Sequence, residues 1–125
     1  MLFEDLEYRG LVYQISDPLL KKLLNEDHLV VYAGFDPTSD SLHVGHLLQV
    51  CNLRRLMQGG HKIVVVLGGA TGMIGDPSGK IEERPLMEPD LLKQNIESLR
   101  IQFEQLLIGQ NFTSGFPAGN PHVIV

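Results

Sequence analysis

Two histidines three positions apart, His43 and His46, form a pattern with an evident chemical use. In a helix this spacing places both imidazoles on one face of the first turn. A helix N-terminus offers free N–H groups and the positive end of the helix dipole, so the histidine pair predicts phosphate recognition. Gly45, which has no side chain, would let a flat base or ribose lie against the helix. A metal site is disfavoured, because no third or fourth ligand follows at a familiar spacing. Surface or capping histidines are the alternative, which the preceding Asp-Pro-Thr loop disfavours.

A second candidate is the glycine-rich segment 68–80, which holds five of the chain's 13 glycines. The dinucleotide-binding fingerprint needs glycine where Ala70 stands, and a Walker loop needs glycine at Ile74 and Ser or Thr at Ile81. These mismatches disfavour a dehydrogenase and a P-loop protein. We interpret the segment as a loop whose backbone approaches a small substrate closely, with Asp76 facing a cation. A wide surface loop is the alternative.

Charged and polar side chains near these two segments extend the candidate site. Lys80 and Arg84 are candidates to clamp a triphosphate, although the two glutamates between them also fit a solvated charge run. Tyr32 and Asp36 flank Gly34 at the end of an expected strand. Tyr32 there either packs in the core or points its hydroxyl into a ligand crevice.

The hydrophobic pattern predicts the elements that position these residues. Residues 29–35 are typical of a strand buried on both faces, and residues 63–67 of a second buried strand. A helix over 43–58 is expected to start after an N-cap at Asp40 or Ser41. Further helices are expected over 2–9, from Ser16 and over 89–107, and a third strand is expected from His122. In the helix from Ser16, one face is expected to carry Leu19, Leu20, Leu23 and Leu24.

The strand, helix and strand between residues 29 and 67 predict a parallel pair joined by a right-handed crossover. In such sheets ligands lie at the carboxyl ends of the strands, near helix N-termini. Segments 36–46 and 68–80 both follow a strand, so we expect them to be neighbours in space. A strand that opens with the last residues predicts a longer α/β protein.

The composition limits the possible functions. The 125 residues carry a formal net charge of −5, with 43% apolar and 20% charged side chains, which is typical of one globular domain. Such an acidic chain is a poor nucleic-acid binder on its own. No segment reads as a membrane span or a secretory signal. The single cysteine, Cys51, excludes an internal disulfide and a multi-cysteine zinc site, and a cytoplasmic location is expected.

Two long motifs, YAGFDPTSDSLHVGHL over residues 32–47 and GGATGMIGDPSGK over 68–80, resemble those of the bacterial-type tyrosyl-tRNA synthetases. The His-Val-Gly-His run within the first motif is similar to the His-Ile-Gly-His signature of class I aminoacyl-tRNA synthetases. The resemblance implies an α/β fold with the Rossmann-like parallel sheet of the class I catalytic domain, first half only. The chain then divides into a helical segment 1–28 and a truncated nucleotide-binding core 29–125.

The resemblance also implies a role for each matching residue. Tyr32 is matched to the residue that hydrogen-bonds the substrate phenol and Asp76 to the one that faces its ammonium group, with Gly34 and Thr71 in the same pocket. The implied ATP-binding residues are Asp36, Pro37, Thr38, His43, Gly45, His46 and Gln49. The implied catalytic residues are His43, His46, Thr38, Lys80 and Arg84, the last two in a loop that holds pyrophosphate.

The implied activity is ATP-dependent activation of tyrosine to tyrosyl-adenylate and transfer to tRNA(Tyr). ATP is then a substrate accompanied by Mg²⁺, the complete enzyme is a homodimer, and neither a protein metal site nor membrane binding is expected. Catalysis rests on positioning and charge stabilisation, without a covalent enzyme intermediate. No Lys-Met-Ser-Lys-Ser-type loop or tRNA-reading domain is present, which argues against tRNA binding by this chain. A non-catalytic module that binds ATP or tyrosine is the alternative, and an unrelated Rossmann-type nucleotide-binding protein is a third.

Overall fold

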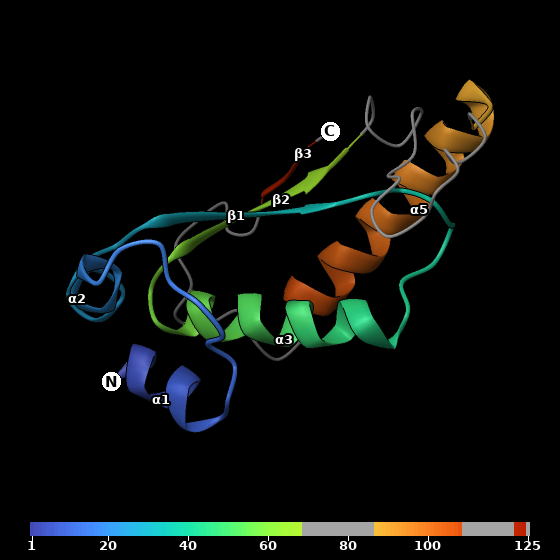
Figure 1. Ribbon diagram of the computed structural model, residues 1–125. Helices are drawn as coiled ribbons and strands as arrows, with labels where there is room; N and C mark the ends of the chain where they lie inside the picture. Colours follow the sequence, from blue (N-terminus) through green and yellow to red (C-terminus); the bar gives the residue numbers. More distant parts are fainter. Residues whose placement is uncertain (69–86, 109–121, 125) are drawn as a thin grey trace.

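The computed structural model describes residues 1–68, 87–108 and 122–124, and it contains a parallel sheet with helices α3 and α5 beneath it (Figure 1). In chain order the elements are α1 (Leu2–Tyr8), α2 (Leu19–Glu26), β1 (Val30–Phe35), α3 (Val44–Gln58), β2 (Lys62–Leu67), α5 (Pro89–Ile108) and β3 (His122–Ile124). Helices α1 and α2 lie together near the start of β1. Among the described residues no helix is long and apolar enough to cross a membrane.

Strands β1 and β2 pair in parallel over their whole length, ending with Phe35 opposite Leu67, and α3 connects them. This confirms the strand–helix–strand unit predicted over residues 29–67. Strand β3 lies in parallel on the other side of β2, so the order is β1-β2-β3. The carboxyl ends of β1 and β2 therefore lie side by side, where the Gly68 amide donates to the Phe35 carbonyl at 3.0 Å.

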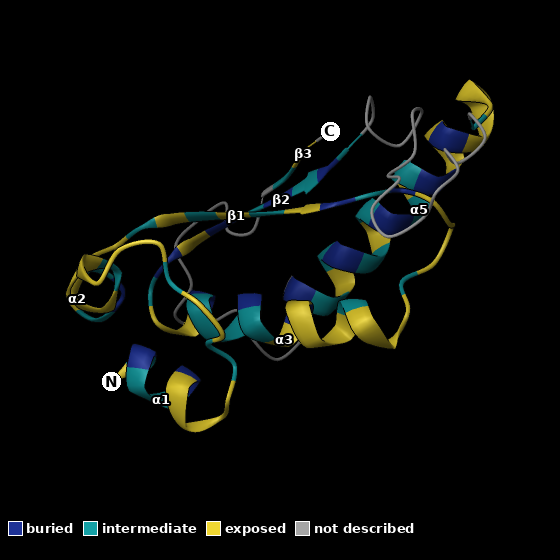
Figure 2. Ribbon diagram, viewed as in Figure 1, coloured by how far each residue is buried: buried dark blue, intermediate teal, exposed yellow. Residues whose placement is uncertain are grey.

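The core lies between the sheet and helices α3 and α5 (Figure 2). Alternate side chains of β2, Ile63, Val65 and Leu67, are fully buried and face these helices. The other buried residues of this cluster are Phe35, Val50, Leu53, Met57, Leu99, Phe103 and Leu107. The helix predicted over residues 89–107 is confirmed, because its apolar stripe is the face of α5 that packs here.

Strand β1 is buried on one face only, so the prediction that both faces are buried is wrong. Val30 is 67% exposed and Tyr32 is 76% exposed, whereas Phe35 is buried. The physical reason is that α3 and α5 both pack on the other face of the sheet, and no described helix covers the face of Val30 and Tyr32. The continuous apolar run therefore predicts the strand correctly, but it does not indicate which faces of the strand other elements cover.

Helix α2 begins at Leu19, three residues later than the predicted start at Ser16. The Asp17 Oδ1 atom accepts a hydrogen bond from the Leu19 amide at 2.8 Å, and Pro18, which has no N–H, is the N-cap. Leu19 is 54% exposed, so it does not share the packed face predicted for it, whereas Leu24 is buried.

The predicted glycine stops are confirmed at α1 and α3. Gly10 follows α1 with a φ of +67°, and Gly60 follows α3 with a φ of +92°, backbone conformations that favour glycine. Gly59 is the C-cap of α3, and its amide donates to the Arg55 carbonyl at 2.9 Å.

His61 is a buried structural residue whose partners the sequence could not name. Its Nδ1 atom accepts from the Leu29 amide at 3.2 Å, so the ring proton lies on Nε2, which is 3.1 Å from the Leu24 carbonyl. Both nitrogens are thereby satisfied, and the ring joins the end of α2 to the starts of β1 and β2.

Candidate functional site

Helix α3 begins at the carboxyl end of β1, and its N-cap is His43, so the prediction of Asp40 or Ser41 is wrong. The backbone bends over residues 39–41 and is extended at His43, and Gln102 of α5 holds the Asp40 carbonyl and the Leu42 amide just before the helix. A capping side chain acts where the backbone turns into the helix, and that point is His43.

The two histidines cap the backbone around each other. The Gly45 amide donates to His43 Nδ1 at 3.1 Å, and the His43 amide donates to His46 Nδ1 at 3.1 Å. Each accepting Nδ1 leaves the proton of a neutral ring on Nε2. The capping alternative is therefore correct, but capping uses one nitrogen of each ring, and each Nε2–H has no partner among residues 1–68, 87–108 and 122–124.

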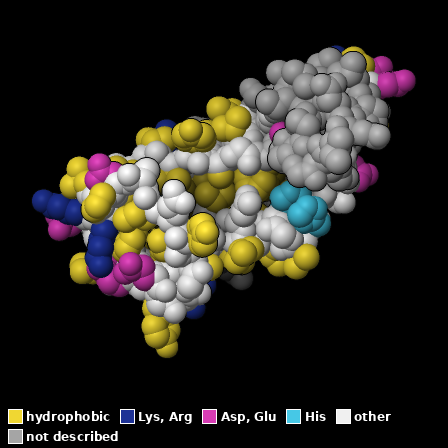
Figure 3. Space-filling view, viewed as in Figure 1, with side chains coloured by type: hydrophobic (Ala, Val, Ile, Leu, Met, Phe, Trp, Pro, Cys, Tyr) yellow, Lys and Arg dark blue, Asp and Glu magenta, His cyan; other side chains and the backbone are white. Residues whose placement is uncertain are grey.

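The two imidazoles stack on each other, with His43 exposed and His46 partly buried. Their centroids are 3.7 Å apart and their planes differ by 21°, so the rings are stacked. Phe35 contacts the His46 ring in an edge-to-face arrangement at 5.8 Å. Histidine side chains form a patch on the molecular face shown in Figure 3.

Burial, and secondarily the neighbouring His43, lower the pKa of His46 below its usual value. Burial in a less polar environment disfavours the charged imidazolium. His46 is therefore neutral at pH 7, which agrees with its Nδ1 acting as an acceptor. The His46 ring therefore offers a bound ligand a neutral Nε2–H donor and not a positive charge.

Gly45 is required for the position of the His43 ring. A Cβ placed at Gly45 would lie 2.9 Å from His43 Cε1 and 3.1 Å from His43 Nδ1, too close for atoms that are not bonded. The glycine of the motif therefore lets the first imidazole fold back over the helix N-terminus. This is a structural reason for glycine, in addition to the predicted contact with a nucleoside.

Replacing Gly45 by alanine is expected to displace the His43 ring while changing helix stability little. The added methyl group pushes the ring away and breaks its bond to the amide of residue 45. Losing this cap costs about 1 kcal/mol, and the helix preference of alanine over glycine returns about the same amount. Thermal unfolding measures the stability, and ring-current shifts of the His43 protons in NMR spectra measure the stacking.

The matched control is Val44→Ala, because Val44 is the adjacent residue and is exposed. We expect this control to leave the His43 ring protons unchanged. Identical His43 shifts in the Gly45→Ala variant and the parent chain would show that the glycine does not determine the ring position.

The loop between β1 and α3 is held by two amide side chains of α5. Asn95 Nδ2 donates to the Pro37 carbonyl at 3.1 Å, and both residues are buried. Gln102 Nε2 donates to the Asp40 carbonyl at 2.8 Å, and Gln102 Oε1 accepts from the Leu42 amide at 2.9 Å. Sequence reasoning missed both amides. The only signal is that a polar residue, Asn95, stands within the apolar stripe of α5.

Two of the residues predicted to contact tyrosine, Tyr32 and Gly34, lie on the exposed face of β1. Tyr32 is 76% exposed, so its interpretation as a core residue is wrong. A Cβ at Gly34 would have no heavy atom of the described residues within 4 Å, so space is open above the strand. Asp36 continues the alternation, and its carbonyl accepts from the Thr38 amide at 2.9 Å. Tyr32 and Gly34 are therefore accessible on the face of β1 opposite Phe35.

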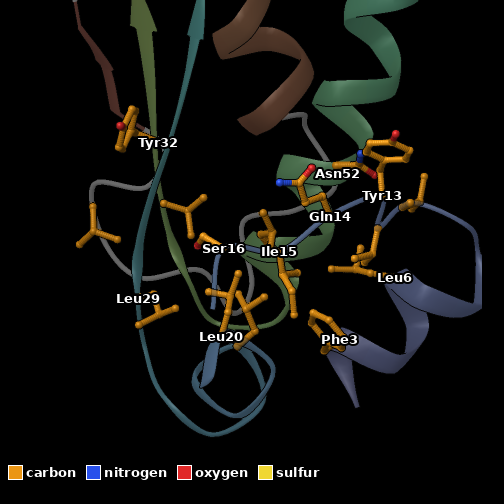
Figure 4. Close-up of a pocket in the computed structure, with 16 residues that line it drawn as sticks. Phe3, Leu6, Tyr13, Gln14, Ile15, Ser16, Leu20, Leu29, Tyr32 and Asn52 are labelled. Carbon is orange, nitrogen blue, oxygen red and sulfur yellow. The ribbon is translucent and has the colours of Figure 1, made fainter. Parts of the chain in front are cut away.

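A cavity of about 850 Å³ lies elsewhere, near the start of β1 and between the N-terminal segment, β1 and α3 (Figure 4). Its walls are mostly apolar. Asn52 lines it, and the Asn52 Oδ1 atom is buried without a partner among the described residues. Tyr32 is the one predicted site residue that lines the cavity, and in Figure 4 it lies across β1 from Asn52 and Gln14. The cavity is therefore separate from the two histidines.

A family model described as class I tRNA synthetases (W and Y) matches residues 24–114, which is more than half of the chain. This chain belongs to the class I tRNA synthetases. The match contains both histidines, the loop before them and helix α5. The family model describes the W and Y enzymes together, so its match supports the class I part of the resemblance over a longer segment than the two motifs.

Curated relatives of this synthetase chain confirm that resemblance. The tyrosine–tRNA ligases of Staphylococcus haemolyticus (strain JCSC1435) and Staphylococcus carnosus (strain TM300) are 49% and 47% identical to it over 106 residues. These alignments cover 84% of this chain and 25% of each relative. The chain thus spans about a quarter of the length of the curated relatives that it matches.

Solved synthetase structures confirm the α/β fold. C-terminally truncated mitochondrial tyrosyl-tRNA synthetases from Aspergillus nidulans and Coccidioides posadasii superpose with TM-scores of 0.82 and 0.71, each at 30% identity. Each similarity covers 98% of this chain, and it covers 36% of the first structure and 34% of the second.

The structure of this synthetase chain brings one group of predicted site residues together. Asp36, Pro37, Thr38, His43, Gly45 and His46 lie in the loop after β1 and the first turn of α3, whereas Tyr32 and Gly34 lie on β1 itself and Gln49 lies in the second turn of α3. The remaining predicted residues, Thr71, Asp76, Lys80 and Arg84, lie outside the described residues, as does most of the glycine-rich segment.

Proposed function

We propose that this chain is part of a tyrosine–tRNA ligase and contributes the site at which ATP activates tyrosine. In the first step a carboxylate oxygen of tyrosine bonds to the α-phosphorus of ATP, the bond to the bridging oxygen breaks, and pyrophosphate leaves. In the second step, which belongs to the complete enzyme, a terminal hydroxyl of tRNA(Tyr) attacks the tyrosyl carbonyl and AMP leaves. The observation that carries the proposal is the stacked, mutually capped histidine pair at the carboxyl end of β1, beside an open strand face.

His43 and His46 are proposed to stabilise the pentavalent phosphorus. Their Nδ1 atoms are held by backbone amides, so the rings present Nε2–H groups in fixed positions. Donors that are already oriented stabilise developing phosphate charge without first having to reorganise. The positive end of the α3 dipole adds to the same field.

The loop before α3 and the first turns of α3 are proposed to form the ATP side. Thr38 and Gln49 are exposed and therefore available to a ligand. Pro37 is buried, and its carbonyl accepts from Asn95, so its contribution is to shape the loop rather than to contact the nucleotide. The proposed ATP-binding residues are Asp36, Pro37, Thr38, His43, Gly45, His46 and Gln49.

The open face of β1 is proposed to receive tyrosine. The Tyr32 hydroxyl then bonds the substrate phenol, and the bare backbone at Gly34 gives the ring room. Asp76 and Thr71 are proposed to bind the substrate's polar end, and Lys80 and Arg84 to hold pyrophosphate. These four assignments rest on the motif resemblance alone.

Magnesium is proposed to arrive with ATP rather than to occupy a site in the protein. In the described part of the chain, no group of three or more His, Cys, Asp or Glu side chains could hold a metal ion. Mg²⁺ commonly binds through substrate phosphates and one or two carboxylates, and Asp36 is the carboxylate beside the proposed phosphate position. Bound there, the ion would neutralise phosphate charge. A homodimer and a cytoplasmic location stay predictions.

Tyrosine-dependent exchange of labelled pyrophosphate into ATP tests the proposal, because only the activation step makes and reverses that bond. We expect exchange with tyrosine and none without it. Binding of ATP and tyrosine without exchange would favour the alternative of a non-catalytic module. Absence of binding to either would contradict both functions.

Replacing Tyr32 by phenylalanine is expected to weaken discrimination between tyrosine and phenylalanine by about ten-fold, which is what one lost hydrogen bond is worth. Tyrosine loses its partner in the variant, whereas phenylalanine loses nothing. The measurement is the ratio of the two kcat/KM values in pyrophosphate exchange. Tyr8→Phe is the matched control, because Tyr8 is 91% exposed and lies on α1. An unchanged ratio in the Tyr32→Phe variant would remove Tyr32 from the site.

A further inference from the structure

Two amide side chains of helix α5 form hydrogen bonds to the backbone of the loop between β1 and α3. In the described part of the chain, no other distant element supplies such side-chain amide bonds to this loop. Asn95 and Gln102 are seven residues apart, two helical turns, so they project from the same side of α5. Asn95 reaches the Pro37 carbonyl, and Gln102 reaches the Asp40 carbonyl and the Leu42 amide.

Gln102 acts on this loop as a neighbouring strand would. Its side-chain amide donates to one backbone carbonyl and accepts from the backbone amide two residues later, at 2.8 and 2.9 Å. The bond to the Leu42 amide is partly buried and the bond to the Asp40 carbonyl is exposed, so together they hold the loop to α5 at its surface. The two bonds fix Asp40 and Leu42, which stand immediately before His43.

A change in the position of the loop would directly move the two histidines. Leu42 is bonded to His43, whose amide donates to His46 Nδ1 at 3.1 Å. A displacement of Leu42 therefore moves the His43 amide away from the His46 ring and also moves the ring of His43 itself. The same helix supports the pair from below, because Phe103 packs on Phe35 at 4.6 Å and Phe35 contacts His46.

We propose that Gln102, assisted by Asn95, is a positioning residue that holds His43 and His46 in the geometry required for transfer at phosphorus. The catalytic part of this assignment rests on the proposed function. Donors that stabilise a transition state lose much of their effect when displaced by as little as 1 Å. Gln102 does not contact substrate in this assignment; it acts through the loop. It therefore affects kcat more than the KM for ATP.

The test compares Gln102→Met, which keeps side-chain length and loses both hydrogen bonds, with Gln105→Met on an exposed position of the same helix. The first readout, hydrogen exchange of the His43 and Gly45 amides, does not require activity. We expect about ten-fold faster exchange in Gln102→Met, the equivalent of one lost hydrogen bond, and no change in Gln105→Met. The amide of Leu53, in the middle of α3, should exchange at the parent rate in both.

The second readout is pyrophosphate exchange, in which we expect kcat to fall while the KM for ATP stays within about two-fold. Gln102→Glu keeps the acceptor for Leu42 and loses the donor to Asp40, so partial restoration of kcat and of amide protection is expected.

Unchanged exchange of the His43 and Gly45 amides overturns the proposal. Faster exchange of Leu53 as well overturns it, because the role would then be general stability. A parent chain without turnover contradicts the proposed function, and amide exchange alone then decides whether Gln102 positions the pair.

Discussion

Replacing His43 by asparagine is expected to lower the rate of tyrosine-dependent pyrophosphate exchange by about two orders of magnitude while helix α3 stays capped. Asparagine is among the best N-cap residues, so its side-chain oxygen replaces Nδ1 as the acceptor for the Gly45 amide. It does not replace the Nε2–H donor, which stands farther from the backbone. The variant therefore separates the two uses of one imidazole: capping, which the structure shows, and catalysis, which we propose.

The measurements for this prediction are the exchange rate and the free energy of unfolding in urea. His43→Ala is the comparison, because it loses both the cap and the donor and should unfold about 1 kcal/mol more easily than His43→Asn. Parent-like exchange by His43→Asn would show that capping is the only function of the residue. Equal stability of the two variants would show that the Nδ1 bond contributes little to α3.

The sequence predicted the strand–helix–strand unit and helix 89–107, because both depend on local hydrophobic period. Runs such as Ile63–Leu67 have few alternatives to a buried strand, and Gly59-Gly60 ends a helix wherever it stands. The positions of His43 and His46 near the carboxyl end of β1 followed from the same unit, since the helix that follows a strand in a parallel crossover starts from that strand's carboxyl end.

The errors concern features that local sequence does not determine. Whether Tyr32 is buried depends on what covers the far face of β1, and none of the described helices does. Asp40 and Ser41 are better N-caps than histidine by average preference, but Gln102, 62 residues from Asp40, holds the loop at Asp40 and Leu42, and the helix starts only after His43. Such long-range hydrogen bonds leave almost no local signal.

Replacing Phe103 by alanine is expected to lower the free energy of unfolding by about 3–5 kcal/mol, the largest stability effect expected in this chain. The Phe103 side chain is fully buried and packs on Phe35, with ring centroids 4.6 Å apart. Removing it takes away apolar contact area and leaves a cavity between α5 and the sheet, which the surrounding residues fill only partly. Urea unfolding followed by circular dichroism measures the change.

Ile101→Ala is the matched control, because Ile101 lies on the same helix and is 43% exposed; its cost should stay below about 1 kcal/mol. Equal costs for the two variants would mean that α5 does not pack as the structure describes. Small domains are stable by about 5–15 kcal/mol, so Phe103→Ala leaves a weakened but measurable fold. Because Phe35 also contacts His46 at 5.8 Å, the same cavity should loosen the histidine pair. We therefore expect the His46 ring signals to broaden in NMR spectra of Phe103→Ala and to stay sharp in Ile101→Ala.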